Sequence, residues 1–294
     1  MKGVIHLVLG KMMGDYSEHL WNLDQVHDLI ERDPATGGRE AVEKIVNDVR
    51  AITDKISEDA EKVISGVNVE AEVTATKLKA EAKVAADKIR ENAAKAASDL
   101  LGNVKKGEDP KSAAVIAKKI LLQAEKNTAE LNRRADESVK AMIDQAKAAA
   151  FKYQRVAEAE ARKMAQLREQ ATKKLSDMTR KTAAKFLDSE DGTADKDGRQ
   201  AAAEIIKMLA QASDQVHRAA TEAAAKIQKV AEEAMVTAKE AARDASALVE
   251  SAIGDANEKI LEVTQTTITE TVGASEAEFY DVGSLRDKWK NRPV

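Results

Sequence analysis

The sequence predicts an all-α fold, an elongated antiparallel bundle or coiled coil of three long alanine-rich helices, preceded by a short amphipathic helix and followed by a short tail. Three observations support this prediction. One third of the 294 residues are charged and only 3% are aromatic, a composition typical of long helices. Apolar residues recur at helical spacing along most of the chain, which argues against the disorder that such a composition could also indicate. Helix-breaking residues gather in a few short stretches.

The opening segment, residues 1–36, predicts an amphipathic helix that ends near the Asp33-Pro34 pair. It holds more bulky apolar side chains than a single seam requires. Its longest apolar run, Val4 to Leu9, is far shorter than the roughly 18 residues needed to span a membrane. It also lacks the small-residue cleavage site of a secretory signal. Together with the absence of cysteine, this predicts a cytoplasmic protein.

Three long helices are expected after this segment, each with an apolar stripe at a mean spacing of about 3.6 residues. The predicted helices cover residues 37–102, 111–188 and 199–272, separated by a joint at 103–110 and an acidic joint at 189–198. Val156 and Val230 are stripe positions of the second and third helices, and the third also places Leu248 in its seam. Glu160 interrupts the second stripe with a charge.

The joints contain residues that begin and end helices. Asp109 followed by Pro110 predicts an N-cap with proline at the first helical position. Gly102 and Gly273 lie where helices are expected to stop. Because the joints are short, consecutive helices are expected to pack antiparallel.

The two ends of the chain hold a large share of its bulky residues, and we predict that they form a self-assembly interface. The tail, residues 273–294, is basic near its end, whereas the opening helix is acidic from Asp15 onward, so opposite charges would steer the ends together. Two different complementary patches at opposite poles produce rings or open filaments. The predicted interface residues are Ile5, Leu9, Met12, Met13, Tyr16, Leu20, Trp21, Phe279, Tyr280, Leu285 and Trp289. The alternative is an opening helix that folds back on the bundle.

Several function classes are not indicated by the sequence. Phosphate-binding glycine loops, nucleophile elbows and zinc-protease motifs are absent from it, so we expect no enzyme and no cofactor. Its 47 basic and 51 acidic residues nearly balance. The lysines of the long helices are not interleaved with aromatic residues, so no nucleic-acid partner is expected.

One stretch partly matches a calcium-binding loop. Asp195, Asp197 and Glu204 occupy the third, fifth and twelfth positions of the EF-hand pattern. Thr193 replaces the first aspartate, and Gln200 stands where the pattern has a hydrophobic residue. Acidic residues at a helix start are also favoured by the helix dipole alone, so this remains a weak metal candidate.

The stretch TEAAAKIQKVAEEAMVTAKEAARDA, Thr221 to Ala245, resembles in composition bacterial coiled-coil scaffolding and filament proteins, late-embryogenesis-abundant proteins, phasins and apolipoprotein-type lipid binders. The first resemblance implies a structural protein that self-assembles as a homo-oligomer or homopolymer. The others imply a stress-protective protein or one that coats a lipid or membrane surface. The first interpretation also explains the unusual ends, and we take it as the prediction, with the second as its alternative.

Overall fold

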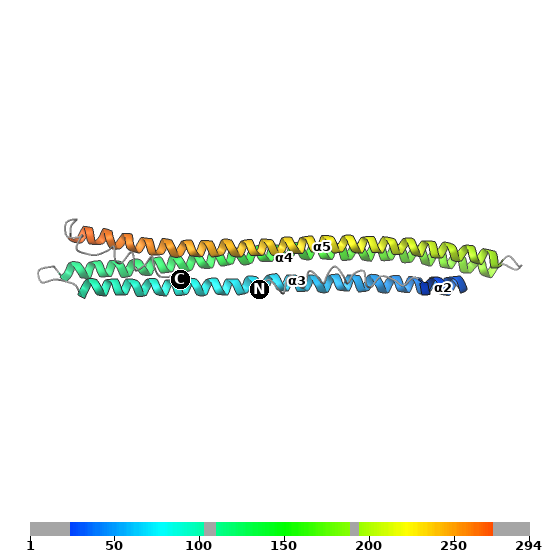
Figure 1. Ribbon diagram of the computed structural model, residues 1–294, viewed down its shortest axis with the longest axis horizontal. Helices are drawn as coiled ribbons and strands as arrows, with labels where there is room; N and C mark the ends of the chain where they lie inside the picture. The colour runs from blue at the N-terminus through cyan, green and yellow to red at the C-terminus, as the bar shows by residue number, and fades with distance from the viewer. Residues whose placement is uncertain (1–23, 103–109, 189–193, 273–294) are drawn as a thin grey trace. The chain divides into compact units, whose positions relative to one another are not determined.

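The computed structural model describes residues 24–102, 110–188 and 194–272. Apart from Asp33, every described residue is helical. The helices in chain order are α2 (Asp24–Arg32), α3 (Pro34–Gly102), α4 (Pro110–Asp188) and α5 (Ala194–Val272) (Figure 1). The predicted all-α helical bundle is therefore confirmed.

The start of α3 lies earlier than the sequence predicted, at Pro34 rather than residue 37, because Asp33 caps the helix. Its Oδ1 accepts hydrogen bonds from the backbone N–H groups of Ala35 at 3.1 Å and Thr36 at 3.2 Å. Its Oδ2 accepts a third bond from Thr36 Oγ1 at 2.7 Å. These bonds stabilise the charged carboxylate and lower the pKa of Asp33. An aspartate cap followed by proline is a strong helix start.

Gly37 and Gly38, which the sequence suggested as part of a joint, lie inside α3 and permit close packing. A Cβ atom on Gly37 would lie 2.5 Å from the backbone nitrogen of Ile30 in α2. A Cβ atom on Gly38 would lie 2.3 Å from Thr179 Oγ1 in α4. The two glycines thus allow α2 and α4 to approach the first turns of α3.

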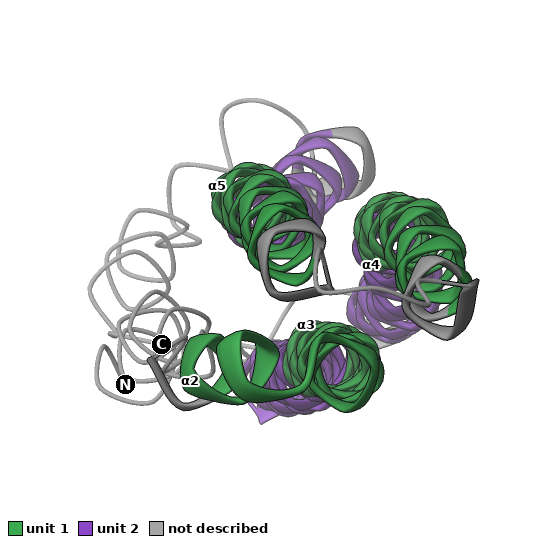
Figure 2. Ribbon diagram, turned by 90° about the vertical axis from the view of Figure 1, so that its right-hand side faces the viewer, with its two compact units in different colours: residues 1–67, 148–236 green, residues 68–147, 237–294 purple. Residues whose placement is uncertain are grey.

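The chain divides into two compact units, and each long helix contributes a segment to both (Figure 2). Unit 1 comprises residues 1–67 and 148–236, and unit 2 comprises residues 68–147 and 237–294. Ion pairs show the antiparallel packing of α4 and α5 in unit 1. Lys152 pairs with Glu233 at 3.0 Å, and Lys163 pairs with Glu222 at 3.4 Å. Moving forward along α4 therefore moves backward along α5.

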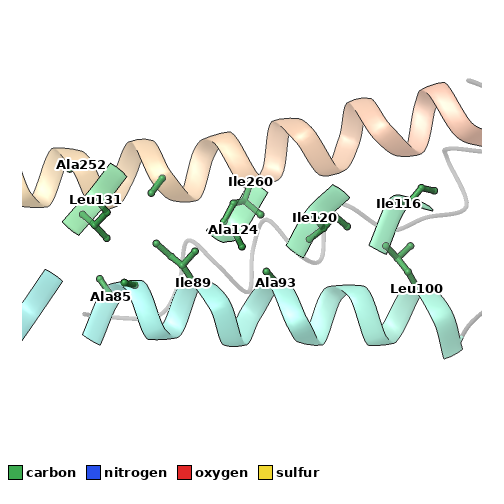
Figure 3. Packing of buried hydrophobic residues seen from close by; sticks show 12 residues of the cluster. Ala85, Ile89, Ala93, Leu100, Ile116, Ile120, Ala124, Leu131, Ala252 and Ile260 are labelled. Atoms are coloured by element: carbon green, nitrogen blue, oxygen red, sulfur yellow. The ribbon is translucent and has the colours of Figure 1, made fainter. Parts of the chain in front are cut away.

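The core of unit 2 is a seam of small and branched side chains. In Figure 3, α3 and α4 are also antiparallel: Leu100 lies near Ile116, and Ala85 lies toward Leu131. The central cluster consists of Ala85, Ala86, Ile89, Ala93, Leu100, Ile116, Ile120, Ala124, Leu131, Ala252, Ala256 and Ile260. Alanine removes little apolar surface from water, at about 25 cal/mol per Å², so stability must accumulate over many turns.

Unit 1 buries larger side chains. Ile45, Ile52, Met164, Leu175 and Ile205 are each at most 1% exposed. They come from all three long helices, so their side chains meet between the helices. Alanine still makes up more than half of the buried hydrophobic residues in the described part of the chain.

The predicted seam of α5 requires one correction. Leu248 is 58% exposed, whereas its neighbour Val249 is 2% exposed. The seam steps four residues from Ala245 to Val249 instead of three to Leu248, because the helical period of 3.6 residues needs a mixture of both steps. Val156 and Val230 are only half-buried.

Candidate functional site

A groove of about 680 Å³ runs between α4 and α5 in unit 1. Its floor and walls combine apolar and charged side chains. It is lined by Ala148, Phe151, Lys152, Arg155, Val156, Ala159 and Glu160 of α4 and by Lys226, Lys229, Val230 and Glu233 of α5.

The apolar part of the groove follows from helical spacing. Val156 and Val230 lie at the edge of the seam and are only half-buried. Ala148 and Ala159 fill little space beside them, which leaves the surface hollow. Phe151 lies two residues before the buried Tyr153 and points away from the core, with 59% of its surface exposed.

The rim of the groove carries four cationic side chains and two carboxylates. Lys152 Nζ donates to Glu233 Oε2 at 3.0 Å, and this bond lowers the pKa of Glu233. Arg155 has no ion pair with any residue that the structure describes. The rim is therefore positive overall, which favours a partner that carries carboxylates.

Glu160 is the charge that interrupted the apolar stripe in the sequence. Its side chain is only 10% exposed. Lys226 Nζ donates to its Oε1 at 2.9 Å, and this bond raises the pKa of Lys226. The other oxygen, Oε2, is buried and has no hydrogen-bond partner among the described protein atoms. The α4–α5 contact thus holds a half-satisfied carboxylate, which is costly in a dry environment.

This arrangement suits docking. A bulky apolar side chain can enter between Phe151, Val156 and Val230, and acidic neighbours on the same partner would meet the cationic rim. The residues that line the groove include no hydroxyl, imidazole or thiol group that could act as a nucleophile.

The eleven side chains predicted to form the self-assembly interface, from Ile5 to Trp21 and from Phe279 to Trp289, all lie outside the described residues. The described structure therefore leaves that interface as a prediction.

The calcium-loop interpretation is not supported by the fold. Because α5 begins at Ala194, Asp195, Asp197 and Glu204 lie on a continuous helix rather than in a loop. Gly198, which the pattern uses for a sharp turn, is buried within this helix. Among the described residues, no three His, Cys, Asp or Glu side chains are grouped so that they could hold a metal ion.

Comparisons of the chain with protein-family models, with curated proteins and with solved structures found no match. No helix in the described ranges is long and apolar enough to cross a membrane. The functional argument therefore depends on the chain's own surfaces.

The groove was missed at the sequence level, although one clue was present. Phe151 is one of only three phenylalanines in the chain, and it lies off the apolar stripe that contains Tyr153. A bulky aromatic residue off the seam, followed by Lys152 and Arg155, marks a surface feature rather than a core position.

Proposed function

We propose that this protein is a non-enzymatic, cytoplasmic structural protein that self-assembles into a filament or scaffold. The observation that carries the proposal is the distribution of apolar side chains, with alanine dominating the interior while large residues lie outside. Ten described large hydrophobic residues are at least 41% exposed, namely Val69, Val73, Val84, Leu101, Val115, Leu121, Leu122, Phe151, Val236 and Leu248.

A bundle that functions alone gains most by burying its largest side chains, at about 1.5–3 kcal/mol for each Val, Leu or Phe. Isolated exposed residues are ordinary on protein surfaces. Here, however, Phe151 is gathered with Val156 and Val230 in an open groove. Contact with a second chain would bury these side chains and supply apolar area that the alanine seam lacks.

In this proposal the ends provide propagating contacts. The predicted interface at the acidic opening segment and the basic tail joins two different patches, and such heterologous contacts extend into filaments or close into rings. The groove provides a further docking position for apolar and acidic side chains of a neighbouring molecule.

The test uses the full-length chain in sedimentation velocity and negative-stain electron microscopy. One variant combines Leu9→Ser with Trp21→Ser, and a second combines Phe279→Ser with Trp289→Ser. Each should abolish filaments or large oligomers, whereas Val236→Ser, an exposed position on α5 outside the groove lining, should leave them intact. A wild-type chain that remains monomeric at every concentration would contradict the proposal.

The groove is tested separately with Phe151→Ser. This change should raise the concentration needed for assembly, because it removes the largest exposed side chain of the groove. Val236→Ser is again the matched control, since it removes a comparably exposed apolar residue in the same unit.

A second candidate function is the coating of lipid surfaces or protection under stress. It is favoured by Phe151 next to Lys152 and near Arg155, because an aromatic residue flanked by cations is typical of helices that lie on anionic membranes. Flotation with vesicles of phosphatidylglycerol and phosphatidylcholine distinguishes the two. Flotation of a chain that does not assemble in buffer would favour the lipid function.

A further inference from the structure

The face of α3 that points away from the core of unit 2 is unusually apolar. Val69, Val73 and Val84 are 54%, 62% and 51% exposed. At 100° per residue these three positions fall within about 60° of one another, on the side of the helix opposite the buried Leu78 and Ala82. In Figure 2, the unit 2 segments of α4 and α5 lie together on one side of α3.

Valine is a poor choice for an exposed helical position. Its branched side chain loses rotamer freedom in a helix, and alanine, common elsewhere in this chain, is a better helix former. The exposed Thr76 and Ala80 continue the same face between the valines. A regular stripe of this kind matches the seam of a helix that has a partner.

The charges beside the stripe have a defined order. One flank carries Glu70, Lys77, Glu81 and Lys88, and the other carries Glu72 and Lys83. Lys77 and Glu81 already approach each other within the helix at 3.6 Å. The other four have no ion-pair partner among the residues that the structure describes, so they are available to a second molecule.

We propose that this face is a two-fold interface between two copies of the chain, in which α3 of one copy packs antiparallel against α3 of the other. The symmetry centre lies between residues 78 and 79. Val73 then faces Val84 of the second copy. Because a two-fold axis of this kind brings equal flanks together, Glu70 meets Lys88, Glu72 meets Lys83, and Lys77 meets Glu81 across the contact.

The charges select this orientation over a parallel one. A parallel, in-register pair would bring opposite flanks together and place Glu72 close to Glu70 and Lys79 close to Lys77 of the second copy. In the antiparallel pair the facing flank charges have opposite sign. Lys79, which lies near the symmetry centre, is already engaged with Asp136 of its own chain at 2.8 Å.

This inference rests on the proposed self-assembly and names one of its contacts. An isologous contact closes on itself and produces a dimer, so it cannot propagate alone. Combined with contacts at the ends, it would join chains laterally. Since the two copies run in opposite directions, a filament built from such dimers would have no polarity.

The first test is charge reversal in the full-length chain carrying Leu9→Ser and Trp21→Ser, in which the end contact is removed and only the dimer is measured. Lys83→Glu alone and Glu72→Lys alone should each raise the dissociation constant by about tenfold, since each change turns two symmetric attractions into repulsions. The double change Glu72→Lys with Lys83→Glu should restore the original value. Lys140→Glu, an exposed lysine on α4 of unit 2, is the matched control and should have no effect.

The second test reports orientation and uses the absence of cysteine from the chain. In the antiparallel pair, residue 80 lies about 5 Å along the axis from its own copy, whereas residue 69 lies about 28 Å away, at 1.5 Å per residue. On mild oxidation Ala80→Cys should form a disulfide-linked dimer and Val69→Cys should not. Efficient cross-linking of both would show a parallel pair and overturn the proposal.

Failure of this inference can be distinguished from failure of the proposed function. If the wild-type chain forms filaments but the terminal variant shows no dimer, the α3 interface is wrong and self-assembly stands. If the wild-type chain is monomeric throughout, both are wrong. Reversals that leave the dissociation constant unchanged also exclude the α3 contact.

Discussion

The two units differ in how they treat a polar side chain buried on α4. In unit 2, Asn127 is 6% exposed and uses both ends of its amide. Its Nδ2 donates to the carbonyl oxygen of Ala256 in α5 at 2.9 Å, and its Oδ1 accepts from Gln123 Nε2 at 2.7 Å. In unit 1, Tyr153 is fully buried, and its hydroxyl has no hydrogen-bond partner.

The difference shows that burial of a polar group and its contribution to stability are separate matters. Asn127 fixes the register of α4 against α5, because a slip of either helix would break its bond to a particular carbonyl group. The Tyr153 ring fills core volume, but its hydroxyl has lost water without gaining a partner. Burial, together with the nearby carboxylate of Asp59, raises the pKa of Tyr153, so the phenol remains neutral.

The largest effect is expected in unit 1 at the half-satisfied carboxylate. Lys226→Met removes the only hydrogen bond given to Glu160 and should reduce the free energy of unfolding by about 2 to 3 kcal/mol, since it leaves a buried charge unpaired. Urea denaturation at pH 7 measures this loss.

The matched control replaces both partners. Glu160→Met with Lys226→Met should recover most of the lost stability, because an apolar pair of similar volume needs no hydrogen bonds. If the double variant is no more stable than Lys226→Met, the cost does not come from the stranded charge.

Two glycines sharpen the contrast between the units. Gly38→Ala in unit 1 should destabilise the protein by about 1 to 3 kcal/mol, because its Cβ would collide with Thr179. Gly254→Ala in unit 2 should stabilise it by about 0.5 to 1 kcal/mol, since a Cβ there meets nothing within 4 Å and alanine favours the helix. Thermal unfolding of both variants followed by circular dichroism decides this. Equal shifts in the same direction would show that Gly38 is not tightly packed.

The comparison of Asn127 with Tyr153 can be tested directly. Asn127→Ala should cost about 1 to 2 kcal/mol, because it breaks the link from α4 to Ala256. Tyr153→Phe should be neutral or stabilise by up to about 1 kcal/mol, because it removes an unpaired hydroxyl and keeps the ring. Urea midpoints of the two variants provide the measurement, and a clear loss of stability in Tyr153→Phe would reveal a hydrogen bond of the phenol.

Much of the helical architecture could be predicted because period and punctuation act locally. A mean spacing of 3.6 identifies a helix, and Pro110 and Gly102 mark helix ends at positions where the structure also begins α4 and ends α3. The first turns of α3 were harder. Two glycines usually indicate a break, but here their lack of a side chain is used for packing against α2 and α4.

The candidate site was not predictable from the stripe. The register between α4 and α5 decides that Val156 and Val230 lie beside a groove, and register depends on contacts between residues far apart in sequence. Glu160 stood out in the sequence as a misplaced charge, but only the fold shows that Lys226, 66 residues away, reaches it. Phe151 was the one local clue.

The smallest effect is expected from an exposed charge network in unit 2. Glu130 accepts hydrogen bonds from Arg133 at 2.7 Å and from Arg134 at 2.9 Å, and Arg134 continues to Asp255 of α5 at 2.9 Å. These bonds lower the pKa of Glu130 from its ordinary 4.5 to about 2. The folded state therefore holds the proton less tightly than the unfolded state, and the network's contribution to stability is present above pH 4.5 and is lost as the pH falls toward 2.

Glu130→Gln should remove this part of the acid sensitivity. Between pH 5 and pH 2 the urea midpoint of the wild-type chain should fall further than that of the variant, and about 0.5 M salt should reduce the difference because exposed charges are screened. Glu233→Gln is the counterpart in unit 1, where a lysine lowers the pKa of a carboxylate across the same pair of helices. A larger effect at Glu130 would show that two arginines that donate hydrogen bonds tie α4 to α5 more firmly than one lysine does. Equal effects would mean that the arginine network acts only through its charge.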